Sequence, residues 1–168
     1  MAEVSLDLVK QLRTKTGAGI LDCRRALDDS KGDMQAAEKL LRERGFAKAD
    51  TRTGRETRQG LVDSYIHPGN RVGAIVEINC ETDFVARTEE FRQLAHDLAM
   101  QVAAMNPAFV NKEDVPSDEE RSPEEAALMS QAFIKDPSRT IDDMVKAMAS
   151  KTGENIRVRR FSRFELGG

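Results

Sequence analysis

Ten consecutive residues alternate in side-chain character, and this alternation constrains the possible fold more than any other feature of the chain. Residues 71–80 read RVGAIVEINC, and the side chains on one side of this stretch are small or apolar: Val72, Ala74, Val76, Ile78 and Cys80. This period is typical of a β-strand with one buried face. The alternation stops at Glu81, and from Thr88 the apolar spacing becomes helical. The sequence therefore predicts a strand-to-helix junction between these two residues.

The predicted junction carries an acid and an aromatic side by side, within the run Thr82-Asp83-Phe84-Val85. Two interpretations of Phe84 are open. Phenylalanine side chains are usually buried, which favours a position in the core. Alternatively, Asp83 and Phe84 lie at an apex of the fold, from which they enter a binding partner.

The residues on either side of the junction predict a sheet covered by helices. Leu61–His67 and Arg71–Cys80 flank Pro68-Gly69-Asn70, which is a favourable hairpin connection. After the junction, one helical stripe is expected to cover the sheet until Asn106-Pro107 ends the helix. The stripe consists of Phe91, Leu94, Ala95, Leu98, Ala99, Val102 and Ala103.

The C-terminal part predicts elements of both kinds. Residues 112–138 are acidic and contain three prolines, so we expect a loop with a short helix over residues 123–132. Residues 140–150 have the spacing of an amphipathic helix. Residues 156–166 predict a closing strand in which a bulge near Arg159-Arg160 would bring Phe161 back into register.

Three short helices are predicted near the N-terminus. Ser5 and Asp33 are suited to cap the first and third helices, and Thr16–Gly19 is expected to form a turn. Gly45 is suited to end the third helix in a left-handed conformation. These helices enclose a very small core.

The chain is expected to divide into three parts. Residues 1–46 form the helical module, residues 47–58 have no apolar stripe and form a linker, and residues 59–168 form the core. A length of 168 residues fits one domain, or one domain with a small appendage.

Composition argues against several classes of function. The net charge of −3 gives no general attraction to nucleic acid or to an anionic membrane. The two cysteines, Cys23 and Cys80, form no CxxC pair, which favours a reducing cytoplasm. Residues 1–11 are mixed in charge and hold no long apolar run, so we expect no signal peptide, transit peptide or membrane span in the chain as given.

A cysteine hydrolase is one alternative function. Cys80, His67 and Asp83 could supply a nucleophile and its base. However, Cys80 belongs to the predicted buried face, where a thiol is inert. His67 and His96 form no close pair in the sequence, so no zinc site is expected.

A nucleotide-binding loop is not expected either. Gly17-Ala18-Gly19 begins like a dinucleotide loop, but Asp22 stands where that motif has its third glycine, and no strand precedes it. The sequence contains no GxxxxGK[ST] motif. We therefore expect the chain itself to bind no nucleotide phosphate and no cofactor.

The C-terminal strand offers the best candidate for nucleic-acid binding. Its basic and aromatic residues are Arg157, Arg159, Arg160, Arg163, Phe161 and Phe164. The basic run is short and lies on an acidic chain. Ion pairing and protection of an edge strand therefore explain it better.

Three stretches together resemble bacterial translation elongation factor Ts. They are TGAGILDCRRAL near the start, NCETDFVA at the junction and GENIRVRRF near the end, in the order that the family has them. The resemblance implies an α+β fold. It comprises an N-terminal three-helix module, similar to a ubiquitin-associated domain, and a core with a three-stranded antiparallel sheet covered by helices on one side.

The resemblance also implies a function and roles for particular residues. Members of the family are guanine nucleotide exchange factors that bind elongation factor Tu and expel its GDP without covalent chemistry. Phe84 would act as an apolar wedge in the partner, with Asp83 placed to disturb the network that holds Mg²⁺. The wedge site comprises Thr82, Asp83, Phe84 and Val85.

Further partner contacts follow from the same resemblance. The positions of Leu12, Ile20 and Leu21 contact one helix of elongation factor Tu in the family. Apart from the resemblance, the place of His67 at a hairpin end predicts a histidine that is solvated or faces the partner. Without the resemblance, the three apolar residues would be assigned to the core. Longer members contain two copies of the core, whereas this chain has one, so a homodimer could supply the second.

Overall fold

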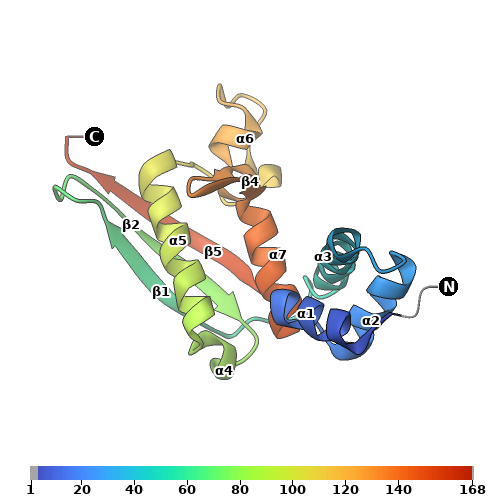
Figure 1. The fold of residues 1–168 in the computed structure, drawn as a ribbon. Helices are drawn as coiled ribbons and strands as arrows, with labels where there is room; N and C mark the ends of the chain where they lie inside the picture. Colours follow the sequence, from blue (N-terminus) through green and yellow to red (C-terminus); the bar gives the residue numbers. More distant parts are fainter. Residues whose placement is uncertain (1–3, 168) are drawn as a thin grey trace.

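The predicted strand and helix lie at the centre of the fold, in a computed structural model that describes residues 4–167 (Figure 1). β2 (Val72–Cys80) is the middle strand of an antiparallel sheet, between β1 (Gln59–Ile66) and β5 (Arg157–Glu165). α5 (Glu89–Met105) crosses one face of this sheet. The α+β fold class, the hairpin and the closing strand are therefore confirmed.

Burial of β2 beneath α5 forms the main core. All seven residues of the predicted stripe on α5 are buried, and they meet the alternating residues of β2 from Ala74 to Cys80. The helix begins at Thr88, whose hydroxyl accepts a hydrogen bond from the Phe91 amide at 3.3 Å. It ends at Asn106 in a left-handed conformation with φ of 48°. Each large side chain removed from water in this way contributes about 1.5–3 kcal/mol.

A bulge in β5 lies where the sequence predicts it. Glu77 pairs with Arg160 but its neighbour Ile78 pairs with Val158, so Arg159 is the extra residue. The shift restores the alternation beyond the bulge. As a result Phe161 packs against the main core.

The N-terminal helices are α1 (Leu6–Thr16), α2 (Ile20–Asp29) and α3 (Met34–Asp50), and they enclose a second cluster of buried side chains. Ser5 caps α1 by accepting a hydrogen bond from the Leu8 amide. Asp33 caps α3 through the amides of Gln35 and Ala36, at 2.9 and 3.0 Å. Both predicted caps are confirmed.

The predicted end of the third helix is wrong. Gly45 lies inside α3 and is buried, and the helix continues to Asp50, four residues into the segment expected as a linker. The reason is the close packing of α3 on α7 (Ile141–Thr152). A Cβ at position 45 would overlap Ser150 Oγ and lie 3.1 Å from Ser150 Cβ, so glycine permits the contact.

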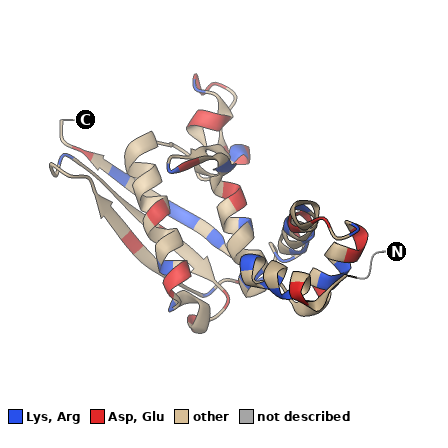
Figure 2. Ribbon diagram, viewed as in Figure 1, with Lys and Arg blue, Asp and Glu red and all other residues tan. Residues whose placement is uncertain are grey.

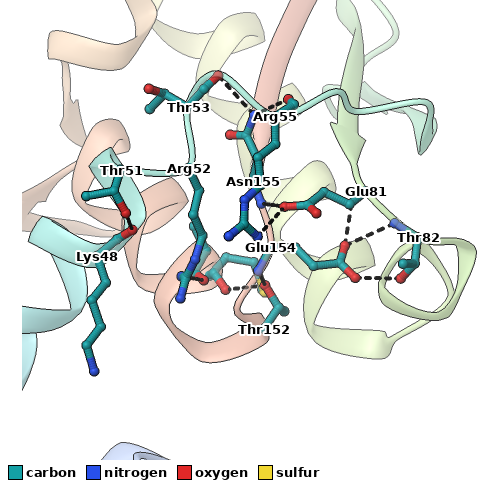
Figure 3. A network of polar contacts seen from close by, with 12 residues as sticks. Lys48, Thr51, Arg52, Thr53, Arg55, Glu81, Thr82, Thr152, Glu154 and Asn155 are labelled. Atoms are coloured by element: carbon teal, nitrogen blue, oxygen red, sulfur yellow. Dashed lines mark hydrogen bonds and ion pairs between the residues drawn. The ribbon is translucent and has the colours of Figure 1, made fainter.

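The segment after α3 is bonded to the core (Figure 3). The side chain of Asn155 donates to the carbonyl oxygens of Thr53 at 3.1 Å and Arg55 at 2.8 Å. Arg52 donates to the carbonyl oxygen of Ala149 at 3.3 Å. The helical module is therefore fastened to the core by helix packing and by these hydrogen bonds.

The region between α5 and α7 differs from the prediction. The expected helix over residues 123–132 is a single turn, α6 (Pro123–Ala126), which is followed by short elements. These are η2 (Leu128–Ser130) and a hairpin of β3 (Ala132–Phe133) and β4 (Asp136–Thr140); η1 (Lys112–Asp114) precedes them. A two-residue strand is too short to show a periodic pattern.

A buried side chain on α5 organises this region instead. Gln101 donates to Gln131 Oε1 and to the carbonyl oxygen of Ala132, both at 3.1 Å, and accepts from the Ile134 amide at 2.9 Å. Long-range hydrogen bonds of this kind leave no local signal in the sequence.

Within residues 4–167, no helix combines the length and the apolar character that a membrane crossing requires.

Candidate functional site

The junction forms an exposed corner between β2 and α5. It contains one helical turn, α4 (Asp83–Ala86), which Thr82 caps by accepting a hydrogen bond from the Val85 amide at 3.4 Å. The side chain of Phe84 is 81% exposed. The core interpretation of Phe84 is therefore wrong, and Phe91 fills the core in its place.

The packing on either side explains this exposure. Val85 and Ala86 pack against the main core, and the chain is buried before the corner at Cys80 and after it at Phe91. A single helical turn can direct only one side towards the core. Phe84 lies on the other side.

Asp83 shares the corner with Phe84. Its carboxylate is 3.0 Å from the guanidinium of Arg87, one turn further along, and the side chain remains 45% exposed. An acid and an aromatic are therefore presented together to solvent, as the apex interpretation expects. An exposed ion pair of this type holds the carboxylate only weakly.

The carboxylate of Glu154 holds the start of the corner by hydrogen bonds (Figure 3). Glu154 Oε2 accepts hydrogen bonds from the amides of Glu81 and Thr82 at 3.0 and 3.1 Å. Its Oε1 accepts from the Thr82 hydroxyl at 2.6 Å. Glu81 in turn accepts from the Asn155 amide at 2.6 Å. No local pattern in the sequence predicts these contacts of Glu154 and Asn155, although both residues lie in the GENIRVRRF stretch that contributes to the resemblance.

The structure does not bring together Cys80 and His67, the nucleophile and base of the hydrolase alternative. Cys80 is buried, and its thiol donates to the Thr82 carbonyl oxygen at 3.1 Å. Burial, with the nearby charge of Glu154, raises the pKa of the Cys80 thiol to about 11. His67 follows the opposite end of the hairpin, because Cys80 pairs with Gln59 whereas His67 comes after Ile66. Within residues 4–167, no group of three or more His, Cys, Asp or Glu side chains could hold a metal ion.

The apolar residues predicted at the edge of the helical module fall into two groups. Ile20 and Leu21, at the start of α2, are 50% and 68% exposed. Leu12 is fully buried among the three helices, so its side chain shapes the module from within and offers no surface to a partner. His67 is exposed, with the Tyr65 hydroxyl 3.2 Å from its Nδ1 atom.

Arginines of the closing strand, whose basic positions are blue along β5 in Figure 2, form ion pairs with acids. Arg160 and Arg159 lie 2.7 and 3.6 Å from the carboxylate of Glu77, and the Arg160 hydrogen bond is the main cause that lowers the pKa of Glu77. Arg163 pairs with Glu165 at 2.7 Å. These pairs support ion pairing rather than nucleic-acid binding as the role of the basic run.

The matches to known proteins all carry the name of one family. The family model described as Elongation factor TS matches residues 46–124, which include the corner. The chain is 48% identical to a protein named elongation factor Ts from Herpetosiphon aurantiacus, over 98% of each chain. It is 43% identical to the protein of that name from Thermotoga maritima, over 98% of this chain and 97% of the other. A longer one from Thermosynechococcus vestitus is 46% identical, and the match spans 67% of its length.

The raised pKa of Cys80 leads to a prediction about its reactivity. With a pKa of about 11, about one thiol in a thousand is ionised at pH 8. In a Cys23→Ala variant, alkylation of native protein by iodoacetamide should therefore be far slower than alkylation of the same variant in urea. Rapid labelling of native protein at neutral pH would contradict the inert role and restore the hydrolase alternative.

Proposed function

The chain belongs to the elongation factor Ts family, and from that premise we propose that it is the guanine nucleotide exchange factor of elongation factor Tu. It would bind the GDP complex of this GTPase in the cytoplasm and promote release of GDP by contact alone, with no covalent step and no cofactor on this chain. The observation that supports this most is the exposed Phe84 on a firmly bonded corner.

The corner suits an aromatic wedge. A buried aromatic anchor often dominates the energy of an interface. The three hydrogen bonds to Glu154 hold the backbone of the corner before any partner arrives. Little conformational entropy would then be lost when Phe84 enters an apolar gap between helices of the GTPase.

Asp83 would act on the metal of the partner rather than on the nucleotide itself. Mg²⁺ requires near-ideal octahedral geometry and is held in nucleotide sites by few protein ligands. A carboxylate brought to the edge of that ligand network would disturb it. Once the metal is lost, the diphosphate loses charge compensation and GDP leaves. The coupling is reciprocal, so GDP must weaken binding of the exchange factor by the same factor.

The helical module would provide a second contact through Ile20 and Leu21. Their exposure at the start of α2 is consistent with docking against one helix of the GTPase. A second contact raises the effective concentration of Phe84 at its own site. His67, beyond the far end of the hairpin, would add a third contact.

A homodimer is a further proposal, and the open face of the sheet supports it. α5 covers one face, whereas the other presents exposed apolar side chains. The strand register places Ile66 and Phe164 on either side of Gly73, with Ile75 in the next row. Antiparallel sheets commonly leave one face to water, but that face is then mostly polar. A second copy could cover this one.

The wedge role predicts that Phe84→Ala separates stability from activity. Because the side chain is 81% exposed, the free energy of unfolding should change by less than about 0.5 kcal/mol. The rate constant for release of labelled GDP from elongation factor Tu should fall about thirtyfold. Asp83→Ala should slow release with less effect on complex formation.

Phe91→Ala is the matched control, because this buried aromatic should lose about 3–5 kcal/mol of stability. Normal GDP release by folded Phe84→Ala protein would refute the wedge.

The second contact predicts a change in concentration dependence. Replacing both Ile20 and Leu21 by serine should raise the concentration for half-maximal exchange about tenfold or more, while the maximal rate changes little. Full exchange by this variant at low concentration would show that the module does not anchor the complex. Arg24→Ser, an exposed change on the same helix, serves as the control.

The dimer predicts that the open face controls assembly. Sedimentation at micromolar concentration should show a dimer for the parent chain and a monomer for a variant with Ile75→Glu and Phe164→Ser. Ile134→Ser removes an exposed apolar side chain elsewhere and should leave the dimer intact. A monomeric parent chain with efficient exchange would make the second copy dispensable.

A further inference from the structure

The corner begins where the sheet stops supplying partners for the backbone. The last paired residues of β2 are Asn79 with Arg157 on one side and Cys80 with Gln59 on the other. The amides of Glu81 and Thr82 therefore lie beyond both ladders. A backbone amide at a partly buried position requires an acceptor.

Glu154 supplies this acceptor from a distant part of the chain. It follows the left-handed Gly153 that ends α7, and that turn brings its carboxylate to the corner. One oxygen accepts from both amides and the other accepts from the Thr82 hydroxyl. Hydrogen bonds to an ionised carboxylate are shorter and stronger than those between neutral groups.

The Thr82 hydroxyl links the Glu154 carboxylate to the helical turn that carries Phe84. It donates to Glu154 and accepts from the Val85 amide, so one atom joins the carboxylate to the first turn of α4. The Thr82 carbonyl oxygen accepts from the Ala86 amide at 3.3 Å. Phe84 lies inside the turn that these two hydrogen bonds close, between Thr82 and Val85.

We propose that Glu154 is a positioning residue for nucleotide exchange: acting through Thr82, it holds Asp83 and Phe84 in the orientation that enters the partner. The inference rests on the proposed function of Phe84 as a wedge. Asn155, the next residue, bonds the segment that follows α3, so the same loop anchors both the corner and the attachment of the helical module.

Two variants test the role of the carboxylate. Glu154→Ala removes both acceptor oxygens and with them all three hydrogen bonds. It should lower the same kinetic constant for GDP release that Phe84→Ala lowers, by about tenfold or more. Glu154→Gln keeps the length of the side chain. Its carbonyl oxygen can accept from both amides and its amide group can donate to the Thr82 oxygen, so it should restore release to within about threefold of the parent. Glu113→Ala, which removes an exposed carboxylate on η1, is the control.

A double-variant cycle separates positioning from general destabilisation. If Glu154 acts through Asp83 and Phe84, Glu154→Ala should change release little, within about twofold, in a chain that already carries both Asp83→Ala and Phe84→Ala. Losses that multiply fully would overturn the proposal, and so would parental release by Glu154→Ala. The assays are run well below the melting temperature of each variant.

Hydrogen exchange provides a measurement that does not depend on the partner. In Glu154→Ala the amides of Val85, Ala86 and Arg87 should exchange about tenfold faster, while those of α5 keep their protection. Unchanged protection at the corner would overturn the positioning role. If the corner loosens as expected but Phe84→Ala releases GDP normally, the wedge function is what fails, and the two failures are thereby distinguished.

Discussion

Burial of β2 beneath α5 is the interaction on which the rest of the structure depends. The two elements are consecutive in the chain, and each directs its apolar residues towards the other, from Ala74 to Cys80 on the strand and from Phe91 to Ala103 on the helix. Residues 81–88 connect the strand to the helix. Because both of these elements are packed into the core, the eight connecting residues must turn at its rim. The corner that carries Asp83 and Phe84 is a geometric consequence of this packing.

An exposed phenylalanine on such a corner is useful only if its backbone is held. Three hydrogen bonds to Glu154 provide this, and they come from the loop that joins α7 to β5. The core therefore contributes twice to the proposed wedge. Packing directs Phe84 outward, and the partly buried hydrogen bonds to Glu154 hold the start of the turn. In the proposed function, binding energy would then be available for disturbing the partner, because little of it would be consumed in ordering the corner.

The helical module is attached to the core more firmly than a polar linker would attach it. Close packing at Gly45 and the hydrogen bonds of Asn155 place α3 against α7 and the following segment against the core. The two proposed partner-binding surfaces are therefore joined in one body and would engage a partner with a fixed separation. A flexible linker would instead give a broad distribution of distances and a lower effective concentration. This arrangement supports the proposed binding of one GTPase at two places at once.

The sequence by itself determined the features that arise from neighbouring residues. The strand, the hairpin, the stripe of α5, the caps at Ser5 and Asp33 and the bulge at Arg159 all follow from periodicity or from hydrogen bonds within a few residues. The tertiary structure alone decided the exposure of Phe84, the burial of Leu12 and the continuation of α3 through Gly45. Each of these depends on what packs against the residue, and a pattern of apolar positions does not specify that neighbour. The contact between Glu154 and Thr82 spans 72 residues of sequence, so only the folded chain brings the carboxylate to the corner.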